Sequence, residues 1–262
     1  MPTATRTRDL NARVAEALLG TGDRSPAEEW LTLQEHAERG AVTNPYQRSF
    51  TRFRTEMCYT KDEAAGGVRL MPDWAYLREM DDALIEERLL LEEKARRVLA
   101  SWHCCCFDVW LCAGGQDRRW PRLLVDTGHR QVILAALKMD GFQSSSWFLE
   151  NRVKFILDEF EVRGLRELWP TFPTWKWTAY QIQFSNGSVI DAVPQGADKL
   201  RGPGATFIHA EELAFWPEAQ QSVNAALPVL KGGGHFCGIT TPNVGSFAHR
   251  IVKGELKKAV WQ

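Results

Sequence analysis

The chain has 262 residues, of which 44% are hydrophobic and 25% charged, and its formal net charge is −1. These values are typical of a soluble globular protein with a sizeable core, either one large α/β domain or a domain with a helical appendage. The near-neutral charge gives no chain-wide basic field, so any contact with nucleic acid must come from a local patch. No stretch approaches the ~20 apolar residues that span a bilayer, and the N-terminus has no apolar signal core. We therefore expect no membrane association.

The six cysteines do not form a zinc-binding pattern. Three of them are consecutive, at residues 104–106, and the run lacks the C-x₂-C pairing of a zinc site. Free cysteine is among the most buried residue types. We interpret all six as small apolar core residues of a protein in the reducing cytosol.

The first 60 residues are expected to form a helical N-terminal extension. Residues 9–19 carry apolar side chains at helical spacing before Gly20, and Ser25 followed by Pro26 predicts the start of a second helix that ends near Gly40.

Residues 43–72 are expected to be irregular, with several arginines among phenylalanines. Arg48, Arg52 and Arg54 could form a nucleic-acid patch with Phe50 and Phe53. A solvated basic face over a small core is the favoured interpretation, because such runs match by chance.

From residue 72 onward the pattern alternates between helices and strands. Helices are expected over residues 73–86, 103–112, 144–160 and 219–229, and buried strands over residues 88–93, 130–138, 205–212 and 234–241. Asn186-Gly187 predicts the turn of a hairpin over residues 179–193. This order indicates an α/β fold.

Two stretches have the composition of a nucleotide site. Residues 94–102 (KARRVLASW) place a cationic turn and Ser101 between a strand and a helix, as in a phosphate-binding loop, although only Ser101 fits the usual glycine-rich pattern. Glu211 and Glu212 directly follow a buried strand, where open α/β sheets bind ligands. Because neighbouring strand residues point to opposite faces, one acid could face a metal ion and the other a water molecule.

Four segments in this order resemble the ATPase domain of the large terminase subunit, the DNA-packaging motor of tailed bacteriophages. They are KARRVLASW (94–102), FSNGSVIDAVPQGADKLRG (184–202), ATFIHAEELAFW (205–216) and ITTPNVGSF (239–247). The resemblance implies an α/β P-loop NTPase of the ASCE type over residues 61–262, with a mainly parallel central sheet flanked by helices.

The resemblance also implies ATP and Mg²⁺ as ligands. Lys94, Arg96 and Arg97 would bind the phosphates, with Arg96 in the place of a loop arginine that senses the γ-phosphate. Ser101 and Glu211 would hold Mg²⁺. All of this requires that the loop near residue 94 and the carboxylates near residue 211 meet across one cleft.

Four further residues receive catalytic or coupling roles from the resemblance. Glu212 would orient the attacking water, and Arg201 would be an arginine finger given to the neighbouring subunit. Thr240 and Thr241 would report the state of the γ-phosphate to DNA.

The implied partners are double-stranded DNA, the portal protein, the small terminase subunit and further copies of the chain in a ring, at the procapsid portal in the host cytoplasm. No acidic cluster follows the last strand to build a two-metal site. We therefore expect no nuclease activity from this chain, and a nuclease domain or chain supplied separately.

Two other functions fit the same pattern. Leu99 and Ala100, which stand where a P-loop has glycine and lysine, would suit an assembly module that keeps the fold without nucleotide chemistry. The first motor domain of a two-domain helicase is also possible, although a second motor domain is missing from the sequence.

Overall fold

The computed structural model describes residues 44–62, 66–95, 98–125, 129–200 and 204–254, and all structural statements concern these ranges. The two helices predicted over residues 9–39 lie outside them, as do Arg96, Arg97 and Arg201. None of the helices within these ranges is long and apolar enough to cross a membrane.

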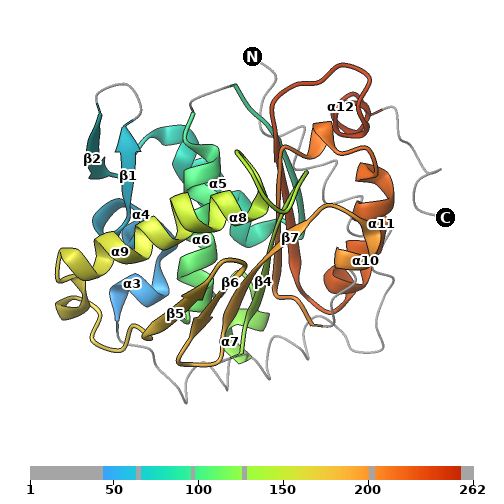
Figure 1. Ribbon diagram of the computed structural model, residues 1–262. Helices are drawn as coiled ribbons and strands as arrows, with labels where there is room; N and C mark the ends of the chain where they lie inside the picture. Colours follow the sequence, from blue (N-terminus) through green and yellow to red (C-terminus); the bar gives the residue numbers. More distant parts are fainter. Residues whose placement is uncertain (1–43, 63–65, 96–97, 126–128, 201–203, 255–262) are drawn as a thin grey trace.

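A seven-stranded mixed sheet forms the centre of the fold (Figure 1). Its five neighbouring parallel strands are, in spatial order, β3 (Leu89–Glu93), β9 (His235–Thr240), β8 (Phe207–Glu211), β4 (Gln131–Ala136) and β7 (Val189–Pro194). Two antiparallel strands, β6 (Gln181–Phe184) and β5 (Trp175–Thr178), complete one edge. The mainly parallel sheet predicted from the sequence is thus confirmed.

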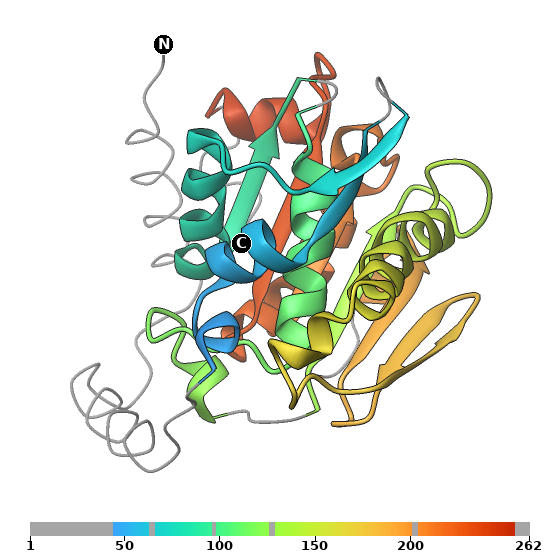
Figure 2. The same cartoon turned by 90° about the vertical axis from the view of Figure 1, so that its left-hand side faces the viewer.

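Helices cover both faces of the sheet. One face is covered by α6 (Ala100–Cys112), around which lie α3 (Pro45–Arg48), α4 (Phe50–Met57), α5 (Ala75–Glu86) and α7 (Arg122–Val125). The other face is covered by α10 (Ala197–Leu200), α11 (Ala219–Lys231) and α12 (Phe247–Val252). Figure 2 looks onto the first face, with α6 running down its middle.

The central helix α6 is buried on almost every side. All of its residues except Ser101 are buried, which agrees with its nearly continuous apolar sequence. The three consecutive cysteines lie on this helix, and all six cysteines are free and buried. The prediction that they are core residues is confirmed.

The prediction of irregular structure over residues 43–72 is wrong. Ser49 caps α4 by accepting a hydrogen bond from the backbone N–H of Arg52, and Phe50 and Phe53 pack into the same core as α6. A hairpin follows, formed by β1 (Tyr59–Asp62) and β2 (Gly67–Leu70). These elements are too short for a periodic pattern to stand out in the sequence.

The favoured interpretation of the arginines in this region is also wrong at one position. Arg52 is solvated and pairs with Glu56 on the surface, whereas the Arg54 side chain is fully buried against Asp81.

The predicted helix over residues 144–160 is a helical rod with a π-helical interruption. Its parts are α8 (Ser145–Phe148), η1 (Leu149–Lys154) and α9 (Phe155–Val162). The π-helical segment η1 changes the register of the side chains along the rod.

His235, at the start of β9, gives the protein a predictable loss of stability in acid. Its ring stacks on Trp120 at 3.6 Å between ring centroids, and burial lowers its pKa to about 3. An unfolded histidine titrates near 6.5, so between about pH 6.5 and about pH 3 the unfolded chain binds a proton that the folded chain excludes. The contribution of His235 is therefore complete above that range and declines as pH falls.

We expect this residue to add roughly 1 kcal/mol per pH unit to the acid dependence of the unfolding free energy. Urea unfolding of the wild type and of His235→Gln at pH 7, 6, 5 and 4 measures it, because the other titrating groups are common to both proteins. Parallel slopes for the two proteins would show that His235 is not the source.

Candidate functional site

Three neighbouring strands end at the same edge of the sheet. Glu93 of β3 is in register with Thr240 of β9, and Glu211 of β8 is in register with Ile239. The residues that directly follow these strands, Lys94, Thr241 and Glu212, are therefore brought together. Sequence positions more than a hundred residues apart meet because parallel strands align their carboxyl ends.

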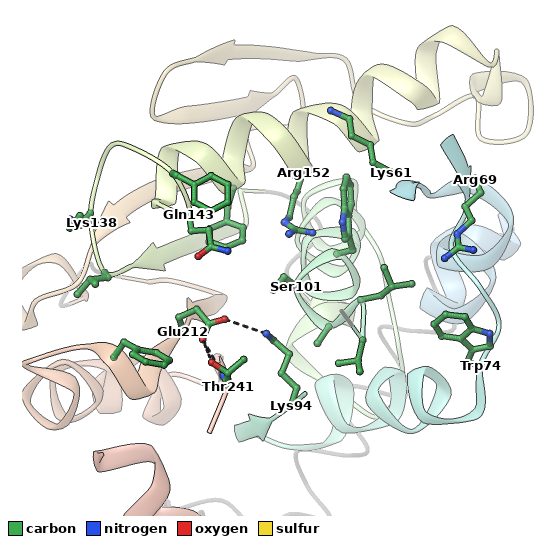
Figure 3. Close-up of a pocket in the computed structure, with 18 residues that line it drawn as sticks. Lys61, Arg69, Trp74, Lys94, Ser101, Lys138, Gln143, Arg152, Glu212 and Thr241 are labelled. Atoms are coloured by element: carbon green, nitrogen blue, oxygen red, sulfur yellow. Dashed lines mark hydrogen bonds and ion pairs between the residues drawn. The ribbon is translucent and has the colours of Figure 1, made fainter. Parts of the chain in front are cut away.

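Glu212 is fixed by contacts on both of its carboxylate oxygens. Thr241 donates two hydrogen bonds to Oε2, from its backbone N–H at 3.1 Å and from its hydroxyl at 3.0 Å. Lys94 Nζ lies 3.3 Å from Oε1 (Figure 3). Glu212 has φ 52° and ψ 44°, a left-handed conformation that ends β8 and turns its side chain into the cleft.

The N-terminus of α6 faces these residues. The N-cap Leu99 has φ 59° and ψ 7° and makes no side-chain capping bond, so it offers no acceptor to the first backbone N–H groups of α6, and Ala100 and Ser101 of the first turn line the same cleft as Lys94 and Glu212. In the first turn, the Ser101 hydroxyl donates to Glu211 Oε2 at 2.9 Å. An open helix N-terminus beside a hydroxyl and a carboxylate suits a phosphate with its metal ion.

These groups line a cleft with a volume of about 840 Å³. That volume is within the usual range for small-molecule sites. Within the described residues, the cationic side chains that line it are Lys61, Arg69, Lys94, Lys138 and Arg152, while Glu212 is the carboxylate that lines it. The excess of cations favours a polyanionic ligand.

A buried histidine stands behind Glu211. His209 contacts Asp108 Oδ2 through Nδ1 at 2.7 Å and Glu211 Oε1 through Nε2 at 3.0 Å. Burial opposes a charge on this ring, but Asp108 and Glu211 raise the pKa of His209 to about 10. The ring is therefore protonated at neutral pH.

The protonated His209 in turn keeps Glu211 ionised. Burial alone would raise the pKa of Glu211, but His209, followed by Arg152 and Lys94, lowers it below its ordinary value. A fully buried carboxylate that stays ionised beside a serine hydroxyl is a group that could bind a cation.

The structure places most of the site residues predicted from the sequence around this one cleft. Lys94, Ser101, Glu212 and Thr241 line it, and Glu211 lies behind Ser101. The loop near residue 94 and the carboxylates near residue 211 therefore meet, through Lys94 and Glu212. Thr240 is different, because it is buried and its hydroxyl accepts from the backbone N–H of Ala214 and donates to the Thr241 carbonyl. Arg96, Arg97 and Arg201 lie outside the described residues.

Three residues of this region were not predicted from the sequence: Asp108, Arg152 and His209. A signal existed for His209, because residues two apart in a strand share a face and His209 precedes Glu211 by two. No local pattern marked Asp108 or Arg152.

Substitutions at Leu99 can test the left-handed backbone conformation of the residue before α6. A left-handed conformation costs a residue with a Cβ atom about 1–2 kcal/mol, and glycine avoids this cost. Allowing for the greater entropy of an unfolded glycine, we expect Leu99→Gly to be more stable than Leu99→Ala by about 1 kcal/mol.

Urea unfolding of the two variants measures this difference, and the lost leucine contacts cancel between them. The usual order, with alanine more stable than glycine, would contradict the left-handed conformation.

The comparison with known proteins agrees with the observed fold. No protein-family model matches the chain, and no curated protein matches it by sequence. Among solved structures, the HK97 bacteriophage large terminase matches with a TM-score of 0.53 and 10% identity, over 79% of this chain and 41% of that chain. The match thus spans less than half of the HK97 protein.

Two matches come from Thermus phage P74-26. Its large terminase ATPase domain matches with a TM-score of 0.40 and 17% identity over 61% of both chains, and a mutant of that domain with a TM-score of 0.45 and 16% identity over 68% of both chains. At these identities the likeness concerns the fold alone. The resemblance predicted from the four segments is confirmed at this level, and the chain has the α/β fold of a phage large terminase.

Proposed function

We propose that the chain is the ATP-hydrolysing motor domain of a viral large terminase subunit, which drives double-stranded DNA into a procapsid. One observation supports this above all: Lys94 and Glu212, 118 residues apart in sequence, lie 3.3 Å apart in a cationic cleft beside the open N-terminus of α6. A lysine for the phosphates and a carboxylate for the attacking water are the groups that phosphoryl transfer requires in close proximity.

The site residues predicted from the sequence each have a role in this proposal. Lys94, together with Arg96 and Arg97, would bind the phosphates. Glu212 would align the attacking water and accept its proton, because Thr241 orients the carboxylate through Oε2 and leaves Oε1 on the side of Lys94. Arg201 would stabilise the transition state in the site of the neighbouring subunit.

Ser101 and Glu211 would hold the Mg²⁺ ion. A hydroxyl and an ionised carboxylate converge here, and Mg²⁺ prefers oxygen ligands. When bound, Mg²⁺ would neutralise charge that develops on the transferred phosphoryl group.

The remaining parts of the proposal concern assembly and DNA. Thr240 and Thr241 follow the end of β9 and would pass the state of the phosphate to the DNA-contacting parts of a ring. The portal protein and the small terminase subunit would be partners at the procapsid in the host cytoplasm, and a nuclease domain or chain would be supplied separately.

An assembly module without nucleotide chemistry is the alternative, favoured by the Leu99 side chain at a glycine-like position. Calorimetry with Mg²⁺ and ATP separates the two functions. We expect the wild type to bind, and Lys94→Ala to bind about 10- to 100-fold more weakly, because it loses hydrogen bonds between charged groups.

Lys176→Ala is the matched control, because Lys176 is exposed on β5 and does not line the cleft. Its affinity is expected to equal that of the wild type. Absence of any heat of binding at millimolar ATP would favour the assembly module.

A further inference from the structure

Arg152 is a cation of the cleft for which the proposed function has no role. It comes from η1, the π-helical segment of the rod, and its guanidinium points toward Ser101 (Figure 3). π-Helical turns within helices are frequent at functional sites, because they shift a side chain out of the regular register.

Aromatic rings surround the guanidinium of Arg152. Its Cζ atom lies 4.8 Å from the centroid of Trp102, 5.5 Å from that of Trp147 and 5.4 Å from that of Phe148. These contacts fix the direction of the side chain and favour its charge. The rings do not serve as hydrogen-bond partners for Nε and Nη1.

Two nitrogen atoms of the Arg152 guanidinium have no hydrogen-bond partner. Nε and Nη1 are buried without a partner, and no carboxylate of the described residues forms an ion pair with the side chain. Buried donors of a charged group without partners are costly, so their persistence beside a cleft points to a ligand that supplies acceptors. A planar fork of donors matches the paired oxygens of a phosphate.

We infer that Arg152 binds the terminal phosphate of the nucleoside triphosphate from the wall opposite Lys94, and that it distinguishes ATP from ADP. This rests on the proposed nucleotide site. The terminal phosphate is the expected target, because Arg152 faces Ser101, which together with Glu211 would hold the Mg²⁺ ion that would neutralise charge on the transferred phosphoryl group. Arg152 would act within its own subunit, unlike Arg201.

Calorimetry with Mg²⁺ and either ADP or a non-hydrolysable ATP analogue tests the inference on the full chain. We expect Arg152→Gln to weaken binding of the analogue about 10- to 100-fold, the usual loss for hydrogen bonds to a charged group, while ADP affinity changes by less than about 3-fold. Arg152→Lys keeps the charge in the aromatic surroundings and should fall between the wild type and Arg152→Gln.

Lys154→Gln is the control, because Lys154 lies on the same segment, pairs with Asp158 and does not line the cleft. A purely structural role of Arg152 would weaken both nucleotides alike or neither, and that result would overturn the inference. If the wild type bound neither nucleotide, the proposed function itself would be wrong and the inference would fall with it.

Discussion

Glu212→Gln is expected to reduce ATP turnover by about 10²- to 10⁴-fold while ATP still binds. Loss of a general base typically costs this factor, because water must then attack without a group to orient it and to accept its proton. The glutamine keeps the size of the side chain and an oxygen that can accept from Thr241, so the cleft should retain its shape. Phosphate release at saturating Mg²⁺ and ATP, with and without double-stranded DNA, measures the effect.

The matched control for Glu212→Gln is Glu218→Gln. Glu218 is exposed and does not line the cleft, so its substitution should leave turnover unchanged. Because the proposal places an arginine finger between subunits, turnover of the wild type should also rise with protein concentration as assembly proceeds. Turnover of Glu212→Gln within about 3-fold of the wild type would remove Glu212 from the catalytic machinery.

The strands that build the site were predictable because their sequences are simple. Residues 88–93, 205–212 and 234–241 are short apolar runs with polar residues or glycine at their ends, and all three are parallel strands of the sheet. Parallel strands buried on both faces give such runs. The resemblance required the loop near residue 94 and the carboxylates near residue 211 to meet, and the aligned ends of these parallel strands bring Lys94 and Glu212 together.

Edge and surface elements were harder to predict. The strand β5 (Trp175–Thr178) was missed because its four residues lie at the edge and are mostly exposed, so no apolar pattern marks them. The helix α4 was missed because it has only eight residues. In both elements tertiary packing, rather than local preference, decides the structure.

Parts of the site depend on backbone conformations that local preference disfavours. Leu99 and Glu212 both have left-handed backbones, which residues other than glycine rarely adopt. Arg152 reaches the cleft from a π-helical segment, whereas the sequence spacing predicted a regular helix. Departures of this kind are concentrated where the proposed ligand would bind, which agrees with the general tendency of functional sites to hold strained residues.

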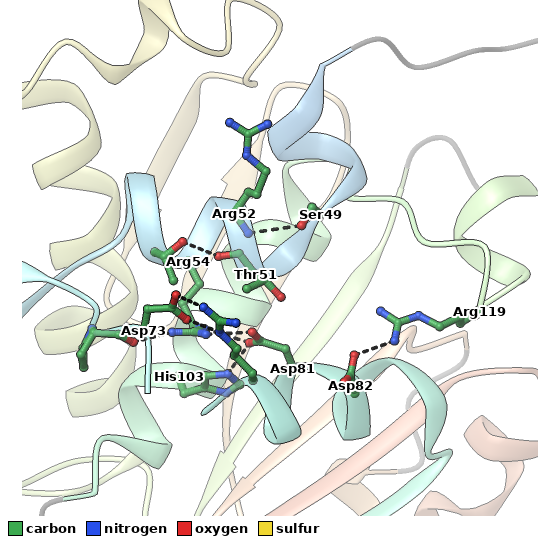
Figure 4. A network of polar contacts seen from close by, with 12 residues as sticks. Ser49, Thr51, Arg52, Arg54, Asp73, Asp81, Asp82, His103 and Arg119 are labelled. Atoms are coloured by element: carbon green, nitrogen blue, oxygen red, sulfur yellow. Dashed lines mark hydrogen bonds and ion pairs between the residues drawn. The ribbon is translucent and has the colours of Figure 1, made fainter. Parts of the chain in front are cut away.

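Arg54→Met is expected to cost about 3–5 kcal/mol of folding stability. Arg54 forms a two-pronged ion pair with Asp81, with Nε and Nη2 each 2.8 Å from a carboxylate oxygen, and its Nη1 donates to the Pro72 carbonyl at 2.7 Å (Figure 4). His103 of α6 contacts the same carboxylate at 2.7 Å. This buried cluster joins α4, α5 and α6, so the variant leaves a buried carboxylate without its main partner.

The neighbouring surface pair isolates the contribution of burial. Arg52 lies two residues away on the same helix and pairs with Glu56 in solvent, so Arg52→Met should leave the unfolding midpoint almost unchanged. Replacing both partners, in Arg54→Met combined with Asp81→Leu, should recover part of the loss, because no charge is then buried unpaired. Urea unfolding of these variants measures the coupling between the two positions. Equal losses for Arg52→Met and Arg54→Met would mean that α4 does not depend on a buried ion pair to dock against α5 and α6.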